Sequence, residues 1–263
     1  PNLHGRTVSD GLGDQITALS WNHTNQVIAV GGMGQKITLI QSSNGQFLSS
    51  IPFHDADAPQ LDKVTDLCFS GNSRYLASST ASSILLWDLK KRSLKTTLAN
   101  PTGAVTCLSL SQDGARCLTG DMNGAVRLWD VRPGTERELP PTSPRGNAAR
   151  AAAISTIDQP LPSLVSSPRV AAGATDGVLT VWDQRANAMI ASGTCHTGPV
   201  AGLAFSPKNG RLVATCGPDG RLCLYDIGSG AVGRDDASAT AEIPDDALTS
   251  VSFHENAIQC AVG

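Results

Sequence analysis

The apolar residues of this chain fall into short stretches in which hydrophobic and polar positions alternate, separated by turn-forming residues. Four stretches end in an aromatic residue followed by aspartate, at Trp87-Asp88, Trp129-Asp130, Trp182-Asp183 and Tyr225-Asp226. Alternation of this kind is typical of β-strands with one buried face. The four dipeptides lie 42, 53 and 43 residues apart, so the pattern indicates a repeating unit that is made of strands.

Each repeat contains the signals of four short strands. The strand that ends in the aromatic–aspartate pair follows a tight turn, with the letters DMNG at 121–124, TDG at 175–177 and PDG at 218–220. Glycine in such a turn supplies the positive φ that a two-residue hairpin requires. A strand of small residues such as YLASS or RVAAG precedes the turn, and a strand such as VTDLCFS or VAGLAFS precedes that one. Four strands per repeat predict the blades of an all-β propeller.

The repeats predict one β-propeller domain over residues 1–263. Its blades are expected at about residues 16–51, 64–99, 105–140, 149–194 and 200–241, with a partial blade at 248–263. The last repeat stops within its second strand, and an open propeller leaves strand edges exposed. We therefore expect further strands from residues before Pro1 or after Gly263, for a total of about seven blades.

Long connections interrupt the repeat at residues 52–63, 140–150 and 158–168. Loops of this length are uncommon in compact domains unless they are functional or disordered, and loops on a rigid scaffold often carry binding residues. The candidate partner-binding residues in these connections are His54, Asp55, Asp57, Asp62, Arg145 and Arg150. Opposite charges on separate loops favour an oriented protein partner. The alternative is that these connections are tolerated insertions whose charges are solvated.

Composition narrows the class of partner. The net charge of −3 argues against a general nucleic-acid or anionic-membrane binder. No apolar run approaches the roughly 20 residues of a membrane span. The seven cysteines are odd in number, lie mostly in apolar stretches and form no C-x-x-C pair, which predicts buried reduced thiols. We find no motif for a metal, a cofactor or a small-molecule substrate.

The aromatic–aspartate strands and the period of 40-odd residues resemble the WD-repeat (WD40) β-propeller family. In well-preserved blades of that family a histidine, a serine or threonine, an aspartate and the tryptophan form a buried hydrogen-bonded set. The resemblance assigns this structural role to His196, Thr215, Asp219 and Tyr225 in the fifth blade, and to Asp176 in the fourth. The third blade departs from the pattern, with Pro101 at the histidine position and Asn123 at the aspartate position.

An enzymatic alternative uses some of the same residues. His196, Asp219 and either Cys195 or Cys216 could form a nucleophile, a base and a residue that orients the base. The blade pattern accounts for the histidine and the aspartate, and cysteines in apolar strands stay protonated and inert. We therefore predict no catalytic residue and a chain that is not an enzyme.

Two successive repeats end in Trp-Asp-x-Arg, at residues 129–132 and 182–185. This pair resembles the box carried by WD-repeat substrate receptors of cullin-RING ubiquitin ligases. The resemblance implies that Arg132 and Arg185 bind a ligase adaptor. The motif is short, so a generic WD-repeat assembly scaffold is a further alternative.

The order of the blades is similar to that of the WD-repeat proteins of the neural-precursor-expressed, developmentally down-regulated type. The similarity rests on a first blade without Trp-Asp, followed by segments such as YLASSTASSILLWDLKKRSLKTTL and AFSPKNGRLVATCGPDGRLCLYDIGSG. It implies a non-enzymatic scaffold at the centrosome, basal body or spindle that recruits the γ-tubulin ring complex for microtubule nucleation. In that family a separate carboxy-terminal helical region holds the complex, and no such region is recognisable here.

Overall fold

The computed structural model describes residues 15–33, 36–52, 63–99, 103–131, 135–139, 152–160, 169–207, 210–228, 230–243, 246–253 and 260–262. All regular elements in these ranges are β-strands. The chain divides into two units, residues 1–101 and 102–263, which are described separately. The prediction of one domain over the whole chain stays a prediction.

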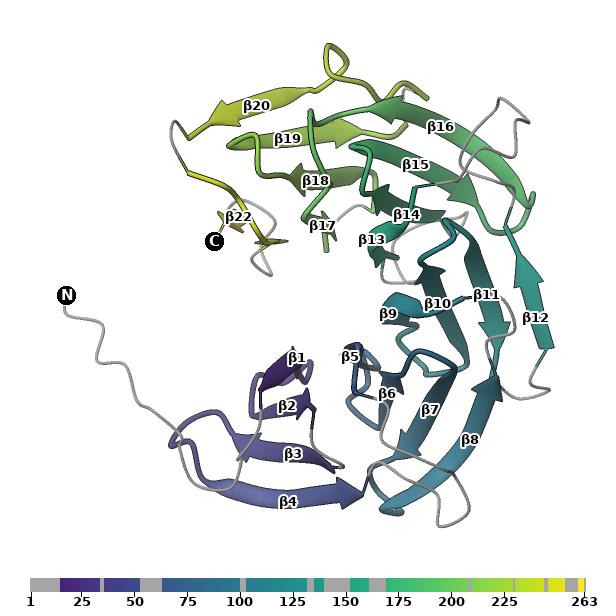
Figure 1. The fold of residues 1–263 in the computed structure, drawn as a ribbon, viewed down its shortest axis with the longest axis vertical. Coiled ribbons are helices and arrows are strands. Elements are labelled where there is room, and N and C mark those ends of the chain that lie inside the picture. Colours follow the sequence, from purple (N-terminus) through teal and green to yellow (C-terminus); the bar gives the residue numbers. More distant parts are fainter. Residues whose placement is uncertain are drawn as a thin grey trace. The chain divides into compact units, whose positions relative to one another are not determined.

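The first unit contains two antiparallel sheets of four strands each (Figure 1). The first sheet consists of β1 (Ile16–Trp21), β2 (Val27–Gly32), β3 (Lys36–Gln41) and β4 (Phe47–Pro52). The second consists of β5 (Asp66–Phe69), β6 (Tyr75–Ser79), β7 (Ser83–Asp88) and β8 (Ser93–Ala99). In both sheets each strand pairs with the next one along the chain.

The second unit contains three more sheets of this kind and one strand pair. The first consists of β9 (Val105–Leu110), β10 (Arg116–Asp121), β11 (Val126–Asp130) and β12 (Thr135–Glu138). The second consists of β13 (Ile154–Asp158), β14 (Arg169–Ala174), β15 (Val178–Asp183) and β16 (Ala188–Thr194). The third consists of β17 (Gly202–Phe205), β18 (Leu212–Cys216), β19 (Arg221–Asp226) and β20 (Ala239–Glu242). The pair is β21 (Val251–Phe253) and β22 (Cys260–Val262).

The predicted fold class is confirmed: these four-stranded sheets are blades of a β-propeller. Apolar residues on facing sheets form the core between neighbouring blades. In the first unit Ala29 and Ile37 of one blade pack against Val64, Leu76 and Trp87 of the next. In the second unit one cluster joins β10 and β11 to β13, β14 and β15, and another joins β14 and β15 to β17, β18 and β19. The alternating pattern of the strands therefore supplies two apolar faces for each blade.

Small residues in the second strand of a blade allow the next blade to approach closely. A Cβ atom on Gly31 would lie 2.9 Å from the Val64 side chain, and one on Gly173 would lie 2.6 Å from the Val200 side chain. At Gly120 the corresponding distance to Ile154 is 2.4 Å. These separations are below van der Waals contact, so the sequence needs glycine at these points of the small-residue strands.

A hydroxyl group in the first strand links consecutive blades within each unit. The hydroxyl of Thr17 donates to the carbonyl of Val64 at 2.5 Å. The hydroxyl of Thr106 donates to the carbonyl of Ile154 at 2.5 Å, and that of Ser155 donates to the carbonyl of Val200 at 2.6 Å. The repeated Ser or Thr therefore fixes the distance between neighbouring first strands.

The sheet β1–β4 has one apolar face that β5 does not cover. Ala18 and Leu39 of this sheet pack toward β5. Leu19, Trp21 and Phe47 lie on the opposite face, and each is about half exposed or more. This is the face that another blade covers in a propeller.

Candidate functional site

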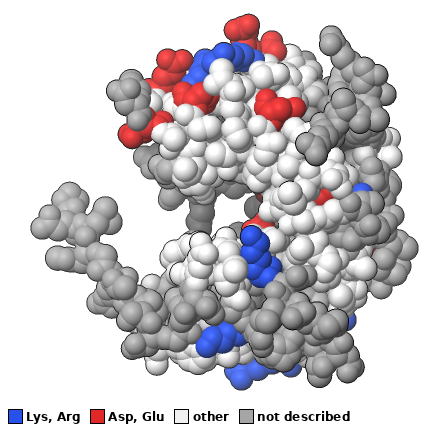
Figure 2. Space-filling view, in the orientation of Figure 1, with Lys and Arg blue, Asp and Glu red and all other residues white. Residues whose placement is uncertain are grey.

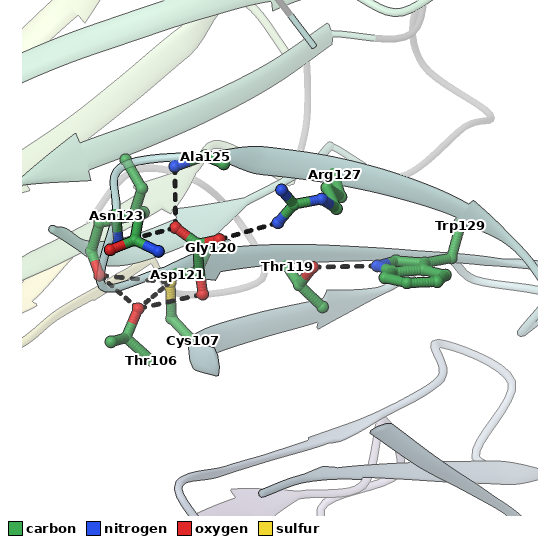
Figure 3. A network of polar contacts seen from close by, with 10 residues as sticks. Thr106, Cys107, Thr119, Gly120, Asp121, Asn123, Ala125, Arg127 and Trp129 are labelled. Carbon is green, nitrogen blue, oxygen red and sulfur yellow. Dashed lines mark hydrogen bonds and ion pairs between the residues drawn. The ribbon is translucent and has the colours of Figure 1, made fainter. Parts of the chain in front are cut away.

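A buried ion pair stabilises the turn between β10 and β11 (Figure 3). A guanidinium nitrogen (Nη1) of Arg127 donates to Oδ2 of Asp121 at 2.8 Å, and both side chains are less than 5% exposed. Oδ1 of Asp121 accepts the backbone N–H groups of Asn123 and Ala125, each at 2.9 Å. One carboxylate therefore satisfies two turn amides and a buried cation.

The same sheet contains a second buried polar contact. Trp129 donates its indole N–H to the hydroxyl of Thr119 at 2.9 Å. In the first unit Trp87 makes the equivalent bond to Ser78 at 3.2 Å. These tryptophans hold the third strand of a blade to the second through side chains as well as through the backbone ladder.

The blade that contains β10 and β11 shows what the sequence interpretation missed. The family pattern directs attention to Pro101 and Asn123, and Pro101 lies outside the described residues. The charge is instead carried by Asp121, two residues before Asn123, and its partner Arg127 comes from the interior of β11. The available signal was the presence of charged residues within the otherwise apolar strands RCLTGD and AVRLWD. A single charge is rarely buried in a strand, so two charges in neighbouring strands indicate a buried pair.

In the blade β17–β20 a histidine, rather than an arginine, is the buried partner of the turn aspartate. His196 is fully buried, its Nδ1 lies 2.9 Å from Oδ1 of Asp219, and its Nε2 lies 2.9 Å from the hydroxyl of Thr215. Asp219 also accepts the backbone N–H of Thr197 at 3.1 Å. A Cβ atom on Gly217 would lie 3.0 Å from Nδ1 of His196, so this glycine makes room for the ring.

The carboxylate of Asp219 accepts, so Nδ1 of His196 carries the proton in this contact. Burial of Asp219 raises its pKa, but the hydrogen bonds from His196 and Thr197 outweigh burial and lower the pKa below its usual value. Both ring nitrogens are occupied by these two contacts. The histidine is therefore a structural link between the segment before β17 and the turn after β18.

The structure departs from the predicted set at Tyr225 and Asp176. Tyr225 is fully buried, but among the described residues its hydroxyl has no hydrogen-bond partner. Asp176 is exposed and accepts the backbone N–H of Val178 at 3.2 Å, so it stabilises a local turn.

The thiols near His196 are poor nucleophiles. Cys195 and Cys216 are both fully buried, and burial raises the pKa of each thiol to about 11. At neutral pH such thiols are protonated, whereas the thiolate is the reactive form. Within the described ranges no group of three or more His, Cys, Asp and Glu side chains could hold a metal ion.

Asp158 at the end of β13 is a partly buried carboxylate that sequence interpretation did not single out. Its Oδ2 accepts the backbone N–H of Phe205 in β17 at 2.9 Å, and its Oδ1 accepts the backbone N–H of Gln159 at 2.8 Å. Burial raises the pKa of Asp158 to about 6, although the two hydrogen bonds act in the opposite direction. The contact ties one blade to the next with a group that titrates in a mildly acidic range.

Of the predicted partner-binding residues, only Arg185 is within the described ranges. Arg185 is exposed in the turn between β15 and β16, and its backbone N–H is held by Oδ1 of Asp183 at 2.8 Å. The other seven residues lie outside the described ranges, and they are His54, Asp55, Asp57, Asp62, Arg132, Arg145 and Arg150. The predictions for these loops stay predictions.

The fold agrees with the comparisons with known protein families. The model of the WD domain, G-beta repeat, matches residues 45–88, 92–130 and 188–226. The chain carries WD40 repeats. Each match starts at or near the fourth strand of one sheet and ends with the third strand of the next. The model of the anaphase-promoting complex subunit 4 WD40 domain matches residues 6–62.

Curated relatives include WD-repeat proteins of several kinds. Protein NEDD1 of Homo sapiens is 23% identical over 94% of this chain, and Protein NEDD1 of Mus musculus is 25% identical over 94% of it. Pre-mRNA-processing factor 19 homolog 2 of Arabidopsis thaliana is 24% identical over 81% of this chain. The chain spans about a third of the length of these relatives, 35%, 35% and 38% respectively.

In the described part of this WD40 chain, the buried polar contacts have structural roles. Its polar side chains with buried partners hold turns and link blades, as at Asp121, Asp158 and His196. Exposed turns such as the one at Arg185 present charged groups to solvent. None of the described residues forms a helix that is long and apolar enough to cross a membrane.

Proposed function

We propose that this chain is the WD40 platform of a scaffold protein that localises the γ-tubulin ring complex at the centrosome, basal body or spindle. The observation that supports the proposal most is the match to Protein NEDD1 of two mammals over 94% of the chain. The blade order described above, with a first blade that lacks Trp-Asp, supports the same assignment. On this proposal the chain works in the cytoplasm and cytoskeleton by binding other proteins.

The physical basis of the proposal is a rigid frame with exposed turns. Blades whose facing surfaces are fixed by apolar cores and by hydroxyl bonds such as that of Thr106 move little when a partner binds. A partner complex can then be oriented by side chains on separate turns. Scaffolding requires this rigidity and no bond-making step.

Localisation of the full-length protein during cell division tests the proposal. The protein that contains this chain is tagged at its own locus, and its position is compared with that of γ-tubulin through mitosis. We expect enrichment at spindle poles or other microtubule-organising sites, and slower microtubule regrowth after cold treatment when the protein is depleted. Uniform cytosolic signal throughout mitosis, with normal regrowth after depletion, would refute the proposal.

A second candidate function is that of a substrate receptor for a cullin-RING ubiquitin ligase. One observation favours it: Arg185 of the Trp-Asp-x-Arg segment is exposed in a turn that Asp183 fixes. Capture of the ligase adaptor by the tagged protein, lost on Arg132→Ala combined with Arg185→Ala, would support this function. The control is Arg234→Ala, which removes another exposed arginine. Equal capture by the double variant would exclude this use of the two arginines.

A further inference from the structure

Five cations meet at one end of the sheet β5–β8. We define the basic hairpin as Arg74, Lys90, Lys91, Arg92 and Lys95, and all five side chains are exposed. Lys90, Lys91 and Arg92 form most of the turn between β7 and β8, and Lys95 follows in β8. The backbone N–H of Leu89 donates to the carbonyl of Arg74 at 3.0 Å, which holds Arg74 beside this turn. In Figure 2 blue side chains show at the lower edge of the view, where Figure 1 places the β7–β8 turn.

The acid in this region pairs with Arg74 and with turn amides rather than with the side chains of Lys90, Lys91 or Arg92. Asp88 is the only Asp or Glu between Ser73 and Ala99, and it is 4% exposed. Its Oδ1 accepts the backbone N–H groups of Lys90 and Lys91 at 3.0 and 3.1 Å, and its Oδ2 accepts Arg74 at 3.3 Å. Burial raises the pKa of Asp88, but these hydrogen bonds outweigh burial and lower it. Asp88 therefore stays charged and shapes the turn, while Lys90 and Lys91 are exposed.

Comparison with the same turn in other blades shows that the fold does not require these cations. The three positions occupied by Lys90, Lys91 and Arg92 are Ser43, Asn44 and Gly45 between β3 and β4. Between β15 and β16 they are Arg185, Ala186 and Asn187. The blade β5–β8 thus carries three consecutive charges where the first blade carries none and the β15–β16 turn carries one.

Arg92 also occupies a backbone conformation that favours other residues. Its φ is +52°, and the equivalent positions are Gly45 at +72°, Asn187 at +50° and Gly230 at +77°. Glycine and asparagine adopt this left-handed region with little strain, whereas arginine does not. Strained residues that persist in a fold cluster at functional sites. An arginine kept here points to a use for its charge.

Lys95 lies at a β-bulge, and its side chain contacts the ring of Tyr75, which Arg74 also approaches. Trp87 pairs with Leu94 and Leu86 pairs with Thr96, so Lys95 is the extra residue of β8. Its ammonium nitrogen lies 4.3 Å from the ring centroid of Tyr75, and the guanidinium carbon of Arg74 lies 5.2 Å from the same centroid. The equivalent extra residues are Leu48 in β4 and Ile190 in β16. The cation at this position is thus specific to this blade.

Protection of an edge strand does not account for the cluster. Lysine often blocks edge-to-edge pairing of sheets, and β8 is an edge strand of its sheet. The corresponding edge strands β4 and β16 contain no charged residue, whereas β12 and β20 carry mostly acidic ones. Three of the five cations lie in the turn rather than along the edge. The basic hairpin therefore has the character of a recognition surface.

We propose that the basic hairpin binds an acidic peptide segment of a partner protein. Without the five cations and Asp88 the chain has 15 basic and 22 acidic residues, so the rest of it repels long polyanions and anionic membranes. A short segment with carboxylates at neighbouring positions matches the size of one hairpin and pairs with lysine and arginine. This inference does not depend on the identity of the proposed scaffold complex.

A binding assay with a defined probe tests the proposal. A fluorescein-labelled glutamate-rich peptide is titrated with the full chain at low and at physiological salt, and anisotropy is measured. We expect saturable binding that weakens as salt is added, because exposed ion pairs are screened. A glutamine peptide of the same length should not bind. Equal binding of the glutamine peptide, or tighter binding of a short RNA or of phosphatidylserine vesicles, would overturn the assignment to an acidic peptide.

Variants locate the binding to the hairpin. Lys90→Glu with Lys91→Glu and Arg92→Glu should weaken peptide binding by about tenfold or more, since three exposed pairs are reversed. Arg92→Gly should weaken it without loss of thermal stability, because glycine suits the positive φ. The control is Arg234→Glu, at another exposed arginine that lies between β19 and β20, which should leave binding unchanged. Binding that survives the triple substitution, or that falls equally in the control, would overturn the proposal.

Discussion

The ion pair between Asp121 and Arg127 leads to a quantitative prediction. Its side chains are 1% and 4% exposed and its N–O distance is 2.8 Å. Removing one partner takes away the opposite charge that lies 2.8 Å from the other buried ion, and breaking a buried pair in this way costs about 3–5 kcal/mol. We therefore expect Arg127→Met and Asp121→Asn each to lower the free energy of unfolding by about 3 kcal/mol or more. The asparagine can still accept the turn amides of Asn123 and Ala125, so its effect reports mainly the lost charge.

The double variant separates the pair from its surroundings. With both charges absent, no ion remains unpaired, so the combined cost should be smaller than the sum of the single costs by about 1–3 kcal/mol. Urea unfolding followed by tryptophan fluorescence and by circular dichroism measures the three values. Arg74→Met is the control, because Arg74 also pairs with an aspartate but its side chain is 47% exposed, and such a pair contributes about 1 kcal/mol or less.

Two outcomes would refute this reasoning. Strictly additive costs would mean that the two side chains do not stabilise one another. A cost for Arg127→Met no larger than that for Arg74→Met would mean that burial of the pair has no energetic weight. Either result would remove the explanation for charged residues in the strands β10 and β11.

Three further predictions follow from single contacts. Burial raises the pKa of Asp158 from 3.8 to about 6, so the folded state binds a proton more tightly than the unfolded state. The linked stability of up to about 3 kcal/mol is present below about pH 4 and lost as the pH rises through about 6. Asp158→Asn should flatten this part of the stability–pH profile in urea titrations, and an unchanged slope would contradict the prediction. Gly173→Ala should destabilise the protein by about 1–3 kcal/mol in thermal unfolding, because its Cβ would lie 2.6 Å from Val200, whereas Gly230→Ala meets no atom within 4 Å and should cost only its strain at positive φ. Arg92→Gly should leave the melting temperature unchanged or raise it. Relief of backbone strain, reduced by the greater entropy of glycine in the unfolded chain, should raise the free energy of unfolding by about 0.5 kcal/mol. A clear fall in the melting temperature would show that the arginine stabilises the fold.

The buried polar groups show how far a sequence can specify such contacts. His196, Thr215 and Asp219 stand at family positions, and the structure brings these three together. Asp121 and Arg127 stand at no such position, because their pairing depends on how β11 lies beside the β10 turn. Tyr225 stands at the tryptophan position, but within the described part of the chain its hydroxyl has no hydrogen-bond partner, since the reach of a side chain cannot be deduced from its place in a repeat.

The basic hairpin shows that prediction of surface sites from sequence is limited in the same way. The run LKKR is visible in the sequence, but its neighbours Arg74 and Lys95 join it only through the antiparallel pairing of β6, β7 and β8 and the bulge at Lys95. The backbone angle of Arg92 is likewise a property of the folded turn. A run of charged residues in the sequence therefore indicates a candidate binding site. The arrangement of the sheet decides which other charged residues join that run on one surface.

The sequence by itself determined the class of fold, the number of strands per repeat and most of their positions, because alternation of apolar residues and turn-forming glycines act over a few neighbouring residues. Only the tertiary structure decided which charged and polar groups become buried partners, as with Arg127 and Asp121 or Asp158 and Phe205. Those contacts join residues of different strands or blades, and their energies depend on burial and distance, which the linear order of residues does not specify.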